Sequence, residues 1–326
     1  MMKLHKLAGL LLLVVCAACS EDTVTADPID LSQVGVADDF TDTRDGHVYK
    51  CVRIGDQIWM AENLAYFLPM GAEDGCYTYG QDIYDGASVG LPGNIWGEVA
   101  RKLLAEWTDR LDESARSTID MYIGYIEIGL PESIAVNGIR NASAEFYAEL
   151  EVKLAQERPR QAMLAAEEEN GGYSERYGFL YSLDGARAAV PEGWRLPTDE
   201  DWLKLEAVLG MAEGEREKMN AWRGTSAGDY LKAGGESGFE ALFAGCDAYE
   251  SSANTMDYIN ESRCGYFWCD EERMVEGLNG SSAALVSEGV IRMVAIYSSG
   301  IWRGTTRLDN VFRPVLYSVR CVKDAR

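Results

Sequence analysis

The stretch Glu192–Trp202 (EGWRLPTDEDW) brings together residue types that could do chemistry: two tryptophans, an arginine and a run of acids. Paired carboxylates could support glycoside hydrolysis, which needs two acids at a controlled separation. The chain holds 53 acidic residues, so a pair can always be chosen and the residue types alone do not identify an enzyme. The order PTDEDW also predicts a helix that begins at Thr198, with Asp201 completing a near capping box. We therefore interpret the stretch as a structural corner.

Histidine is scarce in this chain, which limits nucleophilic and metal chemistry. Of the two histidines, His5 lies near the N-terminus and His47 follows the turn dipeptide Asp45-Gly46. A Ser-His-Asp or Cys-His arrangement would have to use His47, and no nucleophile-elbow motif surrounds a serine. One imidazole cannot form a His-rich zinc or iron site. EF-hand, phosphate-loop and dinucleotide motifs are absent, so we predict neither a metal nor a cofactor.

The cysteines are typical of an exported protein that contains disulfides. Two of the eight, Cys16 and Cys19, belong to the N-terminal segment. The remaining even set of six predicts up to three disulfides in an oxidising compartment, with the connectivity left open. These candidates are Cys51, Cys76, Cys246, Cys264, Cys269 and Cys321. The segment CGYFWC does not have the spacing of zinc ligands.

Aromatic residues give the positive indication of binding. Flat aromatic faces with amides and acids nearby suit the recognition of sugars or peptides. The candidates in the Gly/Ser/Asn-rich second half are Tyr249, Tyr258, Tyr266, Trp268, Tyr297 and Trp302. The alternative for each of them is packing in the core of a small β-domain, above all for the two tryptophans.

The first twenty residues have the pattern of a bacterial signal sequence. A short basic region precedes the apolar run Leu7–Val15, which is too short to span a bilayer. Ala17 and Ala18 before Cys19 resemble a lipobox, so we predict residues 1–18 as a lipoprotein signal peptide and Cys19 as the lipidated first residue. Ordinary signal cleavage is the alternative. The mature chain is thereby expected in the cell envelope as an outer-membrane lipoprotein, facing the periplasm or the cell surface.

Residues 19–38 are acidic, small and weakly periodic, which predicts a flexible tether. The same stretch is similar to the export signals of surface lipoproteins in Bacteroidota-like bacteria. The formal net charge of the whole chain is −23, which excludes nucleic acid as a partner because phosphate binding needs basic patches. It also argues against peripheral docking on anionic lipid.

Hydrophobic periodicity divides the rest of the chain into three parts. Residues 96–176 predict an all-helical insertion, whose apolar residues recur at helical spacing and whose last helix Pro159 interrupts or kinks. The apolar stripe packs within the insertion and on the main domain, or else forms a face for a partner. The flanking segments 39–95 and 177–326 predict a β-rich, turn-rich domain that ends in a strand at Val315–Val322.

Seven segments follow one another in a familiar order: DGHVYKCVRIGDQIWMAENL, CYTYG, YGFLYSLDGA, PEGWRLPTDEDWLKLEAVLG, SGFEALFAG, FWCDEE and YSVRCVKD. This order closely resembles the Fibrobacter succinogenes major paralogous domain, a family of exported bacterial lipoproteins of undefined function. The resemblance covers about residues 38–90 and 177–324. Residues 96–170 have no counterpart in it, which agrees with an insertion.

A more distant resemblance concerns the fold. GWRLPTDEDW is similar to a segment of the formylglycine-generating, sulfatase-modifying family, and YSVRCV resembles its terminal strand. That resemblance implies an α+β, C-type-lectin-like fold: a twisted antiparallel sheet, two helices, long loops and adjacent chain ends. On this fold Cys51 and Cys321 lie on terminal strands that could meet, which implies a Cys51–Cys321 disulfide. The same resemblance suggests a thiol-based enzyme as an alternative, although nothing around Cys264 and Cys269 matches that family's catalytic segment.

Together these observations favour a non-enzymatic, lipid-anchored envelope protein that presents its main domain to a glycan or an envelope protein. One alternative is an enzyme on the same fold, either carboxylate-based or thiol-based. A further alternative is a structural component of a surface assembly, with the helical insertion as its contact.

Overall fold

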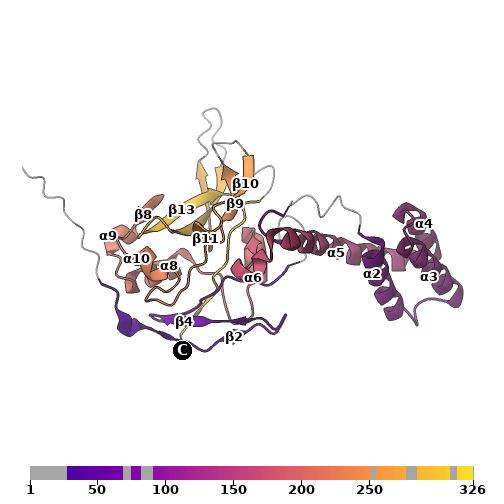
Figure 1. The fold of residues 1–326 in the computed structure, drawn as a ribbon, viewed down its shortest axis with the longest axis horizontal. Coiled ribbons are helices and arrows are strands. Elements are labelled where there is room, and N and C mark those ends of the chain that lie inside the picture. Colours follow the sequence, from indigo (N-terminus) through magenta and orange to yellow (C-terminus); the bar gives the residue numbers. More distant parts are fainter. Residues whose placement is uncertain are drawn as a thin grey trace, which may run out of the picture.

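The structure is a computed structural model that describes residues 28–68, 75–81, 91–250, 255–276, 285–308 and 314–325. The chain is a mixed α+β protein, as expected, with small antiparallel sheets. Figure 1 shows a β-rich main domain (residues 28–81 and 178–325) and a helical arm (residues 91–177) that extends to one side of it. The predicted signal peptide and Cys19 lie outside the described residues.

The strands are short except for three in the second half of the chain. They are β1 (Val34–Val36), β2 (Phe40–Thr41), β3 (Val48–Tyr49), β4 (Cys51–Ile54), β5 (Gln57–Met60), β6 (Cys76–Tyr77), β7 (Leu180–Tyr181), β8 (Ala221–Arg223), β9 (Cys246–Glu250), β10 (Thr255–Ile259), β11 (Cys264–Glu276), β12 (Leu285–Ala295), β13 (Ile301–Arg307) and β14 (Val322–Asp324).

The helices of the described ranges fall into two groups. The main domain holds η1 (Leu31–Gln33), α7 (Leu183–Ala189), α8 (Asp199–Val208), α9 (Glu213–Arg216) and α10 (Ala227–Leu231). The arm holds α2 (Gly93–Glu106), α3 (Glu113–Glu127), α4 (Glu132–Ala142), α5 (Ala144–Asn170) and α6 (Tyr173–Tyr177). Among the described residues, no helix combines the length and the apolar character that crossing a membrane requires.

Two four-stranded sheets build the main domain, in the orders β1-β4-β5-β14 and β11-β12-β13-β8. The first and last strands of the described chain therefore lie in one sheet. A shared core joins the two sheets and α8: the ring of Trp202 lies 5.1 Å from that of Trp59 and 5.7 Å from that of Phe267. This burial of aromatic surface stabilises the packing of the layers.

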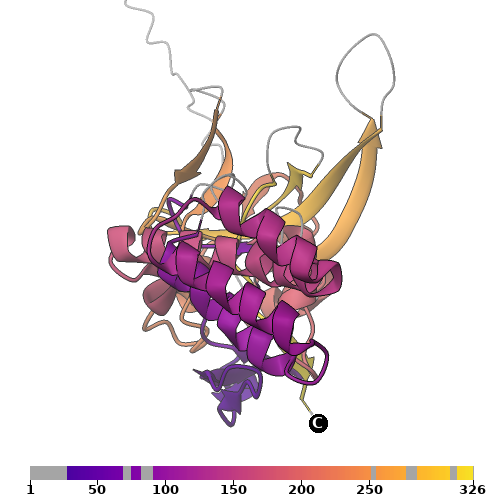
Figure 2. The same ribbon diagram turned by 90° about the vertical axis from the view of Figure 1, so that its right-hand side faces the viewer.

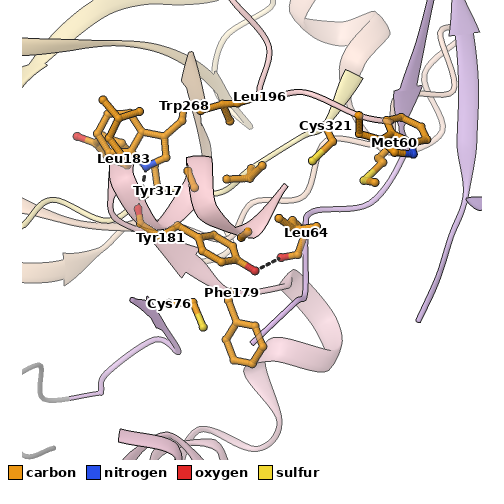
Figure 3. Close-up of a cluster of buried hydrophobic side chains, with 14 of the residues drawn as sticks. Met60, Leu64, Cys76, Phe179, Tyr181, Leu183, Leu196, Trp268, Tyr317 and Cys321 are labelled. Atoms are coloured by element: carbon orange, nitrogen blue, oxygen red, sulfur yellow. Dashed lines mark hydrogen bonds between the residues drawn. The ribbon is translucent and has the colours of Figure 1, made fainter. Parts of the chain in front are cut away.

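A second cluster of buried side chains lies on the opposite face of the β11–β12 pairing (Figure 3). The Trp268 Nε1–H donates to the Tyr181 carbonyl oxygen at 2.7 Å, and the Tyr181 hydroxyl donates to the Leu64 carbonyl oxygen at 3.2 Å. Tyr317 lies edge-on to Trp268, with 4.7 Å between their ring centres. These contacts fix β7 and the C-terminal segment against the sheet.

The C-terminal segment differs from the predicted strand. We expected one strand over Val315–Val322, whereas regular pairing is confined to β14. Leu316 pairs with Asp247 and Ser318 with Phe267 through single bridges, so the segment crosses between several elements. An alternating pattern reports burial of one face and cannot report how many partners a strand has.

The corner at Thr198 forms as predicted. Thr198 and Asp201 make a reciprocal capping box at the start of α8, and Trp202 and Leu205 begin its buried face. Arg195 donates to Asp201 Oδ1 at 2.8 Å and to Asp324 Oδ1 at 2.8 Å. The acids of this stretch therefore bind the protein's own groups.

An ionic network continues from this corner into the second sheet. Glu206 accepts hydrogen bonds from Arg223 at 2.6 Å and from Arg292 at 2.8 Å, and all three side chains are fully buried. Asp199 accepts one from Arg303 Nε at 2.9 Å and pairs with Arg292 at 2.7 Å. The carboxylates of α8 thus neutralise arginine side chains that point inward from β8, β12 and β13.

The arm has a hydrophobic core of its own, formed by α2, α3, α4 and α5. Trp107 and Phe146 meet edge to face at 5.5 Å within it. Pro159 does not interrupt α5, which runs through it for 27 residues, so that part of the prediction is wrong. Turning the view by 90° places the arm helices in front of the main domain (Figure 2). At its root the Tyr173 hydroxyl donates to the Ala244 carbonyl oxygen at 2.6 Å.

Part of the predicted tether is ordered. Residues 31–36, within the predicted tether of residues 19–38, form η1 and the edge strand β1. Val34 and Val36 pair with Ile54 and Val52 of β4. The Asp30 N–H also donates to the Val208 carbonyl oxygen at 3.2 Å. Backbone pairing at a sheet edge orders this segment although its side chains bury little.

Candidate functional site

Among the described side chains, the predicted ligand-binding aromatics do not form one site. Trp268 lies in the core with no exposed surface, so its ring is not available to a ligand. The side chain of Tyr249 lies outside the described residues. Tyr258 joins a tyrosine cluster at the root of the arm, 5.1 Å from Tyr79, and its hydroxyl donates to the Gln81 carbonyl oxygen. Tyr266 is half-buried and stacks on Tyr317 at 5.5 Å.

Tyr297 and Trp302 come together, and the structure adds Trp222, which the sequence pattern did not indicate. Trp222 lies 5.9 Å from Trp302 and 6.0 Å from Tyr297, measured between ring centres. Tyr297 has 66% of its surface exposed, whereas the two tryptophans are half-buried. We call Trp222, Tyr297 and Trp302 the aromatic corner. It lies where β8 and the start of β13 form the edge of the second sheet.

A repeated tetrapeptide explains how two of these rings become neighbours. Trp-Arg-Gly-Thr occurs at Trp222–Thr225 and again at Trp302–Thr305. β8 and β13 pair antiparallel with Trp222 directly opposite Trp302. Because side chains alternate along a strand, each tryptophan points outward while Arg223 and Arg303 point inward to the carboxylates of α8. This repeat is the sequence signal that could have identified Trp222.

Gly304 makes room for the indole of Trp302. A Cβ atom at Gly304 would lie only 2.4 Å from Trp302 Nε1 and 3.0 Å from Asn220 Oδ1. Trp302 therefore occupies the space above the strand, with Asn220 beside it. Asn220 adopts a φ of 51°, in the left-handed region that asparagine tolerates better than most residues. Its Oδ1 accepts a hydrogen bond from the Thr305 N–H at 3.3 Å.

The corner offers hydrogen-bond donors without formal charge. Within the described ranges, neither the indole N–H of Trp222 and Trp302 nor the Asn220 amide N–H donates to a protein acceptor. The Tyr297 hydroxyl lies 3.5 Å from the Cys264 thiol, a contact that raises the pKa of Tyr297 and keeps its phenol protonated at neutral pH. Such a set can stack on an apolar face and donate to hydroxyl or carbonyl oxygens.

All six predicted disulfide cysteines are buried free thiols, so the structure shows none of the predicted cystines. The Cys51–Cys321 pair is wrong for a geometric reason. Met60 pairs with Cys51 on one side, and on the other its N–H donates to the Cys321 carbonyl oxygen at 3.0 Å. A whole strand thus separates the cysteines, whose Cα atoms lie roughly 9–10 Å apart, beyond the limit of about 7 Å for a disulfide.

Cys264 and Cys269 also lack the features of reactive thiols. Both side chains are fully buried. Burial raises the pKa of Cys269 to about 12, although Arg292 opposes this shift. A thiol with so high a pKa is almost entirely protonated at neutral pH and is a poor nucleophile.

An open pocket of about 390 Å³ lies elsewhere, between α7, β11 and the segment after β13. Leu183, Leu308 and Val315 form its apolar part, and Asp184 and Glu272 stand among its polar lining. None of the predicted aromatics lines it. Across the described residues, no three His, Cys, Asp or Glu side chains are grouped in a way that could hold a metal ion.

Comparison with known proteins gives a family match. The Fibrobacter succinogenes major domain matches residues 139–323, which includes α5, the corner at Thr198 and the aromatic corner. Neither the curated proteins nor the solved structures compared with the chain gave a match. Because the match spans more than half of the sequence, the chain belongs to the Fibrobacter succinogenes major domain family.

Proposed function

We propose that this protein is a lipid-anchored component of the bacterial cell envelope whose main domain, C-type-lectin-like in fold, binds a glycan without chemical turnover. The observation that carries this proposal is the aromatic corner: three neighbouring rings at a sheet edge, one of them largely exposed. Aromatic rings that gather at an exposed sheet edge can mark a surface that a ligand covers.

A glycan fits the corner better than a purely apolar ligand. The C–H faces of a sugar ring stack on indole and phenol rings, and its hydroxyls can accept hydrogen bonds from the indole and amide N–H groups. Trp222, Trp302 and Asn220 supply three such donors around the corner. An envelope protein is the alternative ligand, and binding assays with glycans and with envelope proteins distinguish the two possibilities.

Binding can be measured with the chain from Ser20 to Arg326, which keeps every described residue. We expect retention on a panel of neutral glycans, and Trp302→Ala to weaken the best Kd about 30-fold, since an aromatic anchor contributes about 2 kcal/mol. Tyr125→Ala is the control, because Tyr125 is a half-buried tyrosine of the arm that packs on Tyr122 at 5.6 Å. If the wild type bound envelope proteins but no glycan, and Trp302→Ala abolished that binding, the ligand of this site would be a protein.

The anchor needs a separate test. We expect the full chain to incorporate radiolabelled fatty acid in a bacterial host, and Cys19→Ser to abolish this while Cys16→Ser does not. Equal labelling of the Cys19→Ser variant would remove the lipid anchor from the proposal. The glycan site would be unaffected by that outcome.

A role in a surface assembly is the second candidate, and the arm favours it. Ile128 is 78% exposed at the end of α3, and Ile134 of α4 is also exposed. Light scattering of wild type and Ile128→Asp would show whether copies associate through the arm. A monomer at all concentrations for both proteins would speak against self-assembly.

A further inference from the structure

The three rings of the aromatic corner are not coplanar. The Trp222 and Trp302 planes meet at 70°, and the Trp222 and Tyr297 planes meet at 72°. A flat crystalline polysaccharide presents its sugar rings in one plane, and only a coplanar row of aromatic side chains could stack on several of them at once. In this corner Trp222 stands nearly perpendicular to both neighbours.

At this angle the two indoles form two sides of a corner instead of one flat surface. Trp302 covers the strand above Gly304, and Trp222 stands beside it on the adjoining strand. One pyranose ring could lie on one indole while its edge meets the other, with the Asn220 amide within the same small area. Two indoles at this angle can contact one sugar ring from two sides, which suits a single chain or a chain end.

Charge further limits the class of ligand that the aromatic corner can bind. Trp222, Trp302, Tyr297 and Asn220 carry no charge at neutral pH; the cation Arg263 lies near Tyr297, and Lys232 donates to the carbonyl oxygen of the adjacent Ser298. The whole protein has a formal net charge of −23, which repels polyanions over the range of its field. A neutral glycan avoids that repulsion.

Resting on the proposed glycan-binding function, we infer that the aromatic corner recognises a single neutral glycan chain or its end, and not a crystalline polysaccharide surface. A sugar ring of an isolated chain can approach these non-parallel aromatic rings from the side and accept hydrogen bonds from their unpartnered donors. Soluble oligosaccharides are then the ligands that should compete for the site.

The test compares three kinds of probe with the chain from Ser20 to Arg326. Titration calorimetry with cellohexaose, laminarihexaose and xylohexaose measures soluble neutral chains; sedimentation with microcrystalline cellulose and chitin measures flat surfaces; polygalacturonate measures polyanions. We expect a soluble hexasaccharide to bind, with Kd at least tenfold weaker in Trp222→Ala and Trp302→Ala and unchanged in Tyr125→Ala. Tyr297→Ala, an exposed site, serves if either tryptophan variant fails to fold.

The outcomes separate the two ideas. Retention on crystalline cellulose or chitin that the tryptophan variants lose, without binding of soluble hexasaccharides, would overturn the single-chain inference and leave the glycan function standing. Binding of polygalacturonate alone would overturn the neutral-ligand part. Absence of binding to every probe in a folded protein would overturn the glycan function itself.

Discussion

Arg320 donates from Nε to the Asn63 Oδ1 at 2.7 Å, joining the C-terminal segment to the chain just after β5. The other nitrogens of this buried guanidinium donate to the carbonyl oxygens of Met60, Phe239 and Glu240. Burial lowers the pKa of Arg320 to about 9, since the charge has lost its water. Its hydrogen bonds to neutral acceptors compensate, so this side chain ties three segments together.

Shortening this side chain should therefore destabilise the main domain strongly. Arg320→Lys keeps the charge but leaves most of the acceptors unpaired, and each buried unsatisfied group costs about 1–3 kcal/mol. We expect the free energy of unfolding in urea to fall by about 3 kcal/mol or more. Arg160→Lys, at a half-exposed position of α5, should change it by no more than about 0.5 kcal/mol. Equal small effects at both positions would contradict the assigned role.

The buried pair of Asp199 and Arg303 predicts sensitivity to acid. Burial raises the pKa of Asp199, but the hydrogen bonds and charges of Arg303 and Arg292 outweigh it, so the pKa in the folded state lies below 3.8. A depressed carboxyl pKa gives stability that is present above the unfolded-state pKa and is lost as pH falls through the folded-state pKa. Wild type should therefore lose stability progressively below about pH 4.

Asp199→Asn should remove this part of the pH dependence. It leaves Arg303 and Arg292 with one carboxylate fewer, which we expect to cost about 3–5 kcal/mol at pH 7. The difference between variant and wild type should shrink as pH falls from 5 to 2, as followed by unfolding monitored with fluorescence. Asp201 also has a depressed pKa and remains in both proteins, so a difference independent of pH would refute the assignment to Asp199.

Gly304→Ala should damage the aromatic corner without unfolding the protein. The added Cβ would approach Trp302 Nε1 to 2.4 Å and force the indole to move. We expect glycan affinity to fall at least tenfold and circular dichroism to stay unchanged. The control is Gly124→Ala in α3, where nothing lies within 4 Å of the added Cβ and helix propensity should stabilise the arm by about 0.5–1 kcal/mol. Unaltered binding by Gly304→Ala would remove Trp302 from the site.

The cysteines give a prediction about redox state. The chain from Ser20 should titrate all six thiols in urea without reductant, whereas the folded chain should react slowly at pH 8, since every one of the six is buried. Thiol counting with a chromogenic disulfide measures both. Peptide mapping that recovered a Cys51–Cys321 cystine would show that β4, β5 and β14 are arranged differently from the structure.

Local signals in the sequence predicted local structure well. Thr198 and Asp201 specify the helix start by their own hydrogen bonds, which do not depend on distant residues. The hydrophobic period also predicted helices over residues 96–176, and α2 to α6 occupy residues 93–177. The family match begins at residue 139 and so includes α5, which the sequence resemblance had left without a counterpart. That these helices form an insertion stays a prediction. The C-type-lectin-like fold stays a proposal.

Relations between distant strands were not predictable in the same way. Trp222 lies in a three-residue edge strand, too short for any periodic pattern, and becomes part of the site only by pairing with Trp302. The same holds for Cys51 and Cys321, whose separation depends on Met60 lying between them. Nor does the sequence show that Arg223, Arg292 and Glu206 are buried together, because tertiary packing brings them from β8, β12 and α8.

The edge strand β1 also limits how far a lipid on Cys19 could hold the main domain from a membrane. Because residues 31–36 are bound to the main domain, such a lipid would be separated from Leu31 by about twelve residues. Fully extended, a segment of that length reaches roughly 40 Å, about two thirds of what a tether running to residue 38 could span. The start of η1 would then stay within about one bilayer thickness of the membrane surface. The first sheet, which holds both β1 and β14, would accordingly lie nearer to the membrane than a tether free up to residue 38 would allow.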